Sequence, residues 1–207
     1  VAEGRRVINN IQRAAALYLV KNIFSFFLSI ISLFATFPYP VTPLQISFLS
    51  AVTIGVPSLF LALEPNHALV KGKFLTNVFR AALPGGLTDL IIVLGLEAFY
   101  LAFGFTTDEL STMSTILLVV IGLLVLYQVC KPFDWKRRVL MIAMSASSAV
   151  AIIWFGASFG LSQLTIQSFL VLVVFLGLSY PVMNVLLKVC QYGALLWDKA
   201  RHLGHRT

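Results

Sequence analysis

Three ionisable side chains lie inside long apolar stretches of the sequence: Lys21, Asp89 and Glu97. A charge at membrane depth is costly unless it is paired, so such residues usually serve a function. One ammonium and two carboxyl groups can act as a fixed charge and its counter-charges beside the path of an ion. The alternatives are structural. Lys21 can extend along apolar surface to the membrane edge, Asp89 can cap or line an entrance, and Glu97 can balance charge against the first apolar stretch.

Hydroxyl groups, an amide and a proline accompany these charges. Pro57 has no N–H and its ring clashes with the carbonyl four residues back, so it frees backbone groups in the turn that holds Thr53. Freed carbonyls at membrane depth are a recurring way to hold cations. The alternative is a proline kink relieved by serine and threonine hydroxyls, with no ligand. The candidate residues of an ion path are Asn22, Ser25, Ser50, Thr53, Gly55 and Pro57.

The elements that must position these residues are long apolar runs. A helix rises about 1.5 Å per residue, so about 20 apolar residues cross the roughly 30 Å hydrocarbon core of a bilayer. We therefore predict an all-α membrane protein with six transmembrane helices, in which residues 1–207 form a single transmembrane domain. Apolar residues at helical spacing over 3–20 extend the first helix as a cytoplasmic stalk. The predicted spans cover residues 14–36, 41–63, 86–105, 111–130, 139–157 and 164–187.

The distribution of charge predicts how these spans are oriented. Every lysine and arginine except Lys21 falls in the N-terminal segment, the 64–84 connection, the 131–138 connection or the C-terminal tail. By the positive-inside rule, both termini are then cytoplasmic. With 59% hydrophobic and 11% charged residues, the chain is too apolar for a water-soluble domain. The net charge of +7 lies beside the spans, so we expect the lipid bilayer as a partner and no nucleic acid.

The sequence shows no motif for catalysis or for a resident cofactor. It has no glycine-rich phosphate loop and no Ser/His/Asp arrangement, and Cys130 and Cys190 are isolated thiols. We therefore expect no catalytic residue, no cofactor and no disulfide, and the sequence defines no metal ligands. The chain opens without an initiator methionine, and its stalk leads directly into a span. We expect it to be the C-terminal portion of a larger protein.

The opening residues resemble a known family. Residues 3–11 read E-G-R-R-V-I-N-N-I. This stretch is similar to the E-G-R-x-(I/V)-x-N-N-(I/M) segment that opens the fifth transmembrane helix of P-type (E1-E2) cation-transporting ATPases. The order of the later elements also fits that family: a short outer turn, a proline-interrupted helix, and four more spans. The resemblance covers essentially the whole chain, as the fifth to the tenth transmembrane helices.

The resemblance implies a parent protein that pumps a cation at the expense of ATP and passes through an aspartyl-phosphate. ATP and Mg²⁺ would then be bound by the parent, outside this chain. The implied partners are the upstream phosphorylation, nucleotide and actuator domains, the first four transmembrane helices of the same pump, and the transported cation. This chain would lack the ATP-binding and phosphorylation domains and would hold part of the transport site.

This sequence matches only part of the family's transport-site motifs. In calcium pumps the fifth helix supplies Asn-x-x-Glu and the sixth supplies Asn-x-x-Thr-Asp-Gly-x-Pro. Here residues 22–25 read N-I-F-S and residues 50–57 read S-A-V-T-I-G-V-P. Two carboxylates are absent from these motifs, although a hard cation wants six or more oxygen ligands with negative charge among them. Lys21 resembles a lysine that precedes the same asparagine in the proton/potassium pump and the lipid flippases, where it supplies a positive charge or contacts the substrate.

We interpret the chain as the membrane domain of an ATP-driven pump, with calcium as the first expected ion, in a bacterial plasma membrane. Magnesium, a monovalent ion, a polyamine or a lipid remain alternative substrates. One alternative function is a self-contained secondary transporter or channel with six spans, although span 5 has no counterpart of the proline-broken span 2. Another is a membrane scaffold without transport activity, in which Lys21 and Glu97 would have no purpose.

Overall fold

The computed structural model describes residues 2–35, 38–64 and 72–204, and these residues form helices without any strand. Six stretches are long and apolar enough to cross a membrane, which confirms the predicted number of spans. The proline-broken second stretch consists of α2, a π-helical turn and α3. The elements are α1 (Ala2–Ser32), α2 (Pro43–Ser50), η1 (Ala51–Gly55), α3 (Val56–Leu63), α4 (Phe74–Phe103), α5 (Thr107–Val129), α6 (Trp135–Phe155), η2 (Gly156–Phe159) and α7 (Ile166–Gly204).

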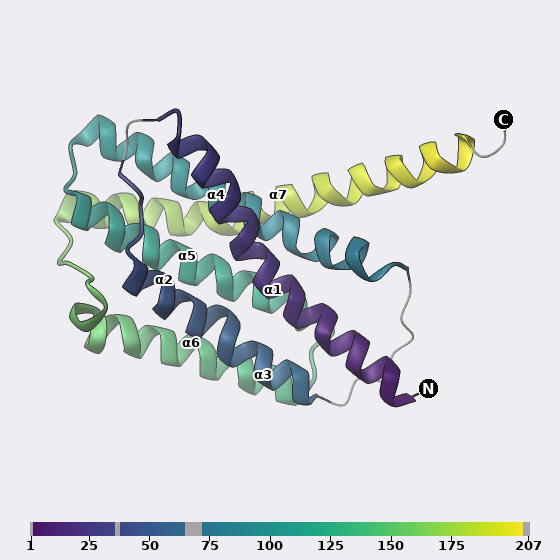
Figure 1. Ribbon diagram of the computed structural model, residues 1–207. Coiled ribbons are helices and arrows are strands. Elements are labelled where there is room, and N and C mark those ends of the chain that lie inside the picture. Colours follow the sequence, from purple (N-terminus) through teal and green to yellow (C-terminus); the bar gives the residue numbers. More distant parts are fainter. Residues whose placement is uncertain (1, 36–37, 65–71, 205–207) are drawn as a thin grey trace.

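The helices lie alongside one another, and the C-terminal part of α7 extends away from the bundle (Figure 1). Helix α5 is the most enclosed span, and α4 packs against α1, α5 and α7. We call the side with the N-terminus of α1, the end of α3 and the α5–α6 connection the basic side. The other end of the bundle, with the turns after α1, α4 and α6, is called the opposite side.

Helix α4 is longer than the sequence predicted. It begins at Phe74 rather than at residue 86, because the helix continues through Pro84. Gly85 and Gly86 explain why this part of α4 is held in the bundle: a Cβ on Gly85 would lie 2.5 Å from a methyl of Val125, and a Cβ on Gly86 would lie 2.6 Å from one of Ile23. Only a residue without a side chain allows α1 and α5 to approach α4 so closely.

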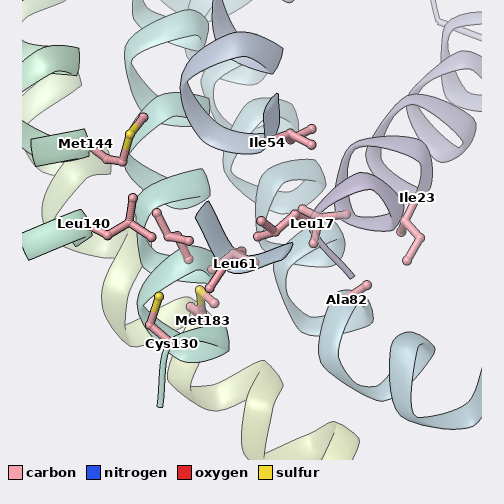
Figure 2. Close-up of a cluster of buried hydrophobic side chains, with 12 residues drawn as sticks. Leu17, Ile23, Ile54, Leu61, Ala82, Cys130, Leu140, Met144 and Met183 are labelled. Carbon is pink, nitrogen blue, oxygen red and sulfur yellow. The ribbon is translucent and has the colours of Figure 1, made fainter. Parts of the chain in front are cut away.

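The buried core nearest the basic side draws side chains from every span. Leu17 of α1, Ile54 of η1, Leu61 of α3 and Ala82 of α4 belong to this cluster (Figure 2). Side chains from the remaining helices complete this cluster: Cys130, Leu140, Met144 and Met183. The close contact of all six spans positions the polar groups described below.

Polar side chains join the helix ends on the opposite side. Thr42 and Gln45 form a capping box at the start of α2, and Thr106 and Glu109 form one at the start of α5. Gln45 also accepts a hydrogen bond from Ser111 of α5 (2.6 Å) and donates one to the carbonyl of Gly160 (3.1 Å). These bonds fix the ends of α2 and α5 against the turn that precedes α7.

Candidate functional site

A cavity of about 30 Å³ lies in the interior, between α1, α2, η1, α4 and α5. That volume is enough to hold water. Three of its lining side chains are polar: Lys21 from α1, Thr53 from η1 and Asp89 from α4. The rest of the wall is apolar: Leu17, Val20, Phe24, Leu49, Ile54, Leu118, Gly122 and Val125. The cavity is therefore a small, largely apolar space with three polar side chains in its wall.

Lys21 is held by the second span. Its Nζ donates a 2.6 Å hydrogen bond to Oγ of Ser50, and Ser50 Oγ donates in turn to the carbonyl of Ile46 at 2.6 Å. The ammonium group therefore lies between α1 and α2, where it also borders the cavity. The ammonium donates a hydrogen bond to the hydroxyl of Ser50. Its positive charge would repel a cation that enters the cavity beside it.

The turn that contains Thr53 is widened rather than unwound. Residues 51–55 form a π-helical turn, closed by a bond from the Val56 N–H to the Ala51 carbonyl, and Pro57 follows as a buried residue at the start of α3. Thr53 Oγ1 donates to the carbonyl of Leu49 at 2.8 Å. Such π-helical turns often occur at functional sites. The sequence predicted freed backbone groups here, and the structure accommodates them by a wider helical turn.

Gly122 allows the π-helical turn η1 to approach α5 closely. A Cβ on Gly122 would lie 2.6 Å from Cγ2 of Thr53 and 2.8 Å from its Cβ. The sequence analysis did not single out Gly122, because an isolated glycine in an apolar helix gives no sign of which helix it faces. The contact sets how close Thr53 comes to the centre of the bundle.

Asp89 of α4 lines the same cavity as Lys21. Its side chain is 5% exposed, and its Oδ1 has no hydrogen-bond partner among the described residues. The alternative in which Asp89 caps a helix is wrong, because α4 begins at Phe74 and Asp89 lies well inside it. Asp89 and Lys21 thus bring opposite formal charges to one enclosed space.

The other predicted residues are not gathered at this cavity. Asn22 is exposed on the outer face of α1, and Ser25 is half-buried one turn further along. Gly55 is half-buried in η1. Glu97 lies eight residues beyond Asp89, about 12 Å along α4; it is 1% exposed, and neither carboxyl oxygen has a hydrogen-bond partner among the described residues. The structure therefore unites Lys21, Ser50, Thr53 and Asp89 and leaves Asn22, Ser25 and Glu97 apart from them.

A second polar cluster, which sequence reasoning missed, joins the stalk to the other spans on the basic side. Glu64, at the end of α3, accepts a hydrogen bond from Arg13 of α1 at 3.0 Å and one from Arg137 of α6 at 2.6 Å. Arg137 also donates to the carbonyls of Cys130 and Pro132. We call these contacts the Glu64 clasp. The residues are far apart in sequence, so no local pattern could have indicated that they meet.

Asn10 strengthens the same junction. Its Nδ2 donates to the carbonyl of Ala62 at 3.0 Å and to that of Glu64 at 2.7 Å. These carbonyls belong to the last turn of α3, where backbone acceptors have no partner within the helix. The clasp and Asn10 together join the N-terminal part of α1 to the end of α3, the helix that carries Pro57.

Six helices that are long and apolar enough to cross a membrane define a polytopic helical membrane domain. No protein-family model matches the chain. Calcium-transporting ATPase CtpE of Mycolicibacterium smegmatis is 35% identical over 170 residues, which are 73% of this chain and 21% of that protein. Probable cation-transporting ATPase exp7 of Streptococcus pneumoniae is 34% identical over 158 residues, 72% of this chain and 20% of that protein. P-type sodium-transporting ATPase4 of Toxoplasma gondii is 36% identical over 66 residues, 32% of this chain and 5% of that protein.

The chain belongs to the family of P-type cation-transporting ATPases. This finding confirms the resemblance stated from the opening residues. The chain spans about one fifth of the length of the first two relatives. The matched proteins therefore contain large parts that have no counterpart in this chain.

Proposed function

We propose that the chain is the membrane domain of an ATP-driven cation pump and contributes its ion path and alternating-access helices. The observation that carries this proposal is that Lys21 and Asp89, from two different helices, line one small cavity among the spans. Ionisable groups inside a membrane domain usually mark the path of an ion. The family supports a pump over the alternative of a self-contained six-span transporter or channel.

The cavity offers oxygen ligands together with a fixed positive charge. The carboxyl of Asp89 and the hydroxyl of Thr53 can coordinate a cation, while the ammonium of Lys21 competes with it. One carboxyl and one hydroxyl are too few oxygens for a divalent ion on their own. Parts of the pump outside this chain would therefore have to supply the further ligands that complete the site.

Calcium is our first proposed substrate, because relatives in three mycobacterial species are named as calcium-transporting ATPases. Magnesium, a monovalent cation, a polyamine and a lipid are the alternatives. We place the domain in a bacterial plasma membrane with its basic side in the cytoplasm. ATP and Mg²⁺ would be bound by the phosphorylation, nucleotide and actuator domains of the same pump, which also supplies the first four transmembrane helices.

Alternating access would start at the stalk. A push on α1 from the phosphorylation domain would pass through Asn10 and the Glu64 clasp to α3. Helix α3 is continuous with the π-helical turn at residues 51–55, which holds Thr53 at the cavity. A rotation of that turn would change the distance between Thr53 and Asp89 and so the affinity for the ion.

The test is ATP hydrolysis by the full-length protein in proteoliposomes, measured against the concentration of each candidate cation. The wild-type protein should be stimulated by at least one cation and should accumulate it only when ATP is present. Asp89→Asn should lower the apparent affinity about tenfold or more, since a ligand charge is lost. Asp108→Asn is the matched control, because Asp108 is an exposed carboxyl at the start of α5.

Cation flux that needs no ATP, through the chain on its own, would overturn the pump and favour the channel or secondary transporter. An Asp89→Asn protein with the stimulation curve of wild type would exclude the cavity as the ion site while leaving the pump itself intact.

A further inference from the structure

A groove on the basic side of the bundle lies apart from the proposed ion path. It runs between the first turns of α4 and the C-terminal part of α7, where α7 leaves the bundle and the two helices diverge (Figure 1). Two adjoining hollows of about 340 Å³ and about 510 Å³ form it, and both are lined by Arg80, Cys190 and Ala194. We call it the α4–α7 groove.

The wall of this groove is largely apolar and open. Leu75, Phe79 and Leu195 line it and are each more than half exposed. Gly193 also lines it, and a Cβ at Gly193 would meet nothing within 4 Å. Sites for small molecules are typically concave and mostly apolar, with a few placed polar groups. The wall is therefore suited to hydrocarbon, such as the acyl chains of a lipid.

The helical repeat turns one face of each helix into the groove. Residues three and four apart share a face of a helix. The lining residues of α7 follow that spacing: Leu187, Cys190, Gln191, Ala194 and Leu195. Those of α4 form two adjacent rows four residues apart, Leu75, Phe79 and Leu83 in one and Thr76, Arg80 and Pro84 in the other. The groove is thus built by two continuous helices and not by loops.

The charge of the groove is positive. Arg80 is exposed and lines both hollows. Its guanidinium has five donors in a planar fork that matches phosphate, so it can hold a phosphate and a protein group at once. Lys188 is exposed on α7, and the helical repeat places it beside Gln191 and Leu195 at the rim. Among the described residues, no acidic side chain lines either hollow.

The groove lies at the basic-side end of two spans. The apolar stretches that could cross a membrane run from Phe74 to Phe103 and from Ile166 to Leu195. Arg80 lies six residues inside the first of these, about 9 Å along the helix, and about 14 Å from Asp89. Such a level is where the head groups and the first part of the acyl chains of a bilayer lie. Basic pockets between spans at this level bind anionic head groups.

An anionic phospholipid fits both the charge and the apolar wall. Free phosphate has no chains for the wall, and a zwitterionic lipid brings a cation that Arg80 and Lys188 repel. We propose that the α4–α7 groove binds an anionic phospholipid, with its phosphate on Arg80 and its acyl chains along Phe79, Leu83 and Leu187. The bound lipid joins the diverging part of α7 to α4. This site does not depend on the proposed pump function.

Protection of Cys190 tests the proposal, because this partly exposed thiol lines both hollows. The full-length protein in detergent is titrated with dioctanoyl phosphatidylglycerol, dioctanoyl phosphatidylcholine or inorganic phosphate, and maleimide labelling of Cys190 is followed by mass spectrometry. Phosphatidylglycerol should slow the labelling to a plateau, and the other two should not. Arg80→Gln should weaken the apparent affinity for phosphatidylglycerol about fivefold, since one charge contact is lost. Lys136→Gln, an exposed lysine at the start of α6, is the matched control.

Three results would overturn the site: equal protection by phosphatidylcholine, protection by inorganic phosphate alone, or an Arg80→Gln protein with the affinity of wild type. Cys130 is buried, so it should stay unlabelled and so report that each variant is folded. None of these measurements involves transport, and their failure would leave the proposed pump intact.

A second variant fills the groove without changing its charge. Gly193→Leu places a side chain in the open wall, whereas Gly177→Leu adds the same side chain where a Cβ also meets nothing within 4 Å, outside the groove. Native mass spectrometry of the full-length protein, purified with an equal mixture of the two lipids, measures which lipid is retained. Wild type and Gly177→Leu should retain phosphatidylglycerol in preference, and Gly193→Leu should lose that preference. An unchanged preference in Gly193→Leu would place the lipid elsewhere and refute the groove.

Discussion

At the scale of single residues, the ion path proposed above depends on the balance between one ammonium and one carboxyl. Lys21 is directed to Ser50 by a 2.6 Å hydrogen bond, and Asp89 keeps an oxygen without a partner among the described residues. In an enclosed apolar space the interaction between charges is much stronger than in water. A cation that enters the cavity would therefore be repelled by the ammonium of Lys21 and attracted by the carboxyl of Asp89.

Removal of the lysine should favour the cation. We expect Lys21→Ala to lower the half-saturating cation concentration of the ATPase about tenfold or more, because a competing positive charge is lost from the cavity. Nucleotide binding should stay unchanged. The measurement is the stimulation curve of the full-length protein, with Ser29→Ala, an exposed position on the same helix, as the control. Coincident curves for Lys21→Ala and wild type would exclude a role for Lys21 at the site.

Gly122 should be intolerant of a side chain. An added Cβ would overlap Thr53, so Gly122→Ala should destabilise the protein by about 1–3 kcal/mol through overpacking. Gly177→Ala on α7 is the matched control, because a Cβ there meets nothing within 4 Å. Thermal unfolding of the purified proteins in detergent measures both. A Gly122→Ala protein as stable as the control would show that η1 does not approach α5 this closely.

The two cysteines should differ in reactivity. Burial raises the pKa of the Cys130 thiol to about 11, so at about pH 8 only about a thousandth of it is the reactive thiolate. Cys190 is partly exposed on α7. Maleimide should therefore label Cys190 in the folded protein and Cys130 only after denaturation, as read by mass spectrometry. Labelling of Cys130 should rise as the pH approaches 11, because its thiolate forms there; rapid labelling at neutral pH would contradict its burial.

At the scale of elements, the sequence was sufficient to predict the spans but not their contacts. Apolar runs of about 20 residues indicate membrane helices by length alone, and all six exist. The start of α4 was missed because Pro84 and two glycines are typical of a helix boundary, whereas close packing of Gly85 and Gly86 against neighbouring helices keeps the helix continuous.

The sequence was sufficient to single out the charged residues of the candidate site, but not to predict which of them lie together. Lys21, Asp89 and Glu97 could be singled out because ionisable residues are rare in apolar runs. Which of them share a space depends on the rotation of each helix. The exposed position of Asn22, directly after Lys21, illustrates this: neighbours in sequence point about 100° apart around a helix.

The Glu64 clasp should couple the stalk to α3. Glu64→Gln would leave the guanidinium groups of Arg13 and Arg137 without their counter-charge, at side-chain exposures of 18% and 10%. We expect a loss of about 3 kcal/mol in stability and a lower ratio of transported cation to hydrolysed ATP. The exposed Asp108→Asn again serves as control. A variant with normal stability and an unchanged transport ratio would remove the clasp from the coupling route.

At the scale of the whole molecule, charge and polarity are divided between the two ends of the bundle. The basic side carries the Glu64 clasp and nearly all arginine and lysine residues, whereas the opposite side is fastened by neutral groups and Glu109. The enclosed cavity lies between them. Such a division matches a pump that receives its driving force on one side and exchanges its ion with the other.

This division predicts the orientation of the domain in the cell. Asp108 at the start of α5 and Lys136 at the start of α6 are exposed on opposite ends of the bundle. In a protein whose own cysteines are replaced, Asp108→Cys should react with a membrane-impermeant maleimide added to intact cells, and Lys136→Cys only after the membrane is opened. The reason is that basic loops resist translocation, so the basic side stays in the cytoplasm. The reverse pattern would place the stalk outside the cell, where no ATP-dependent domain could drive it, and would refute the pump as proposed.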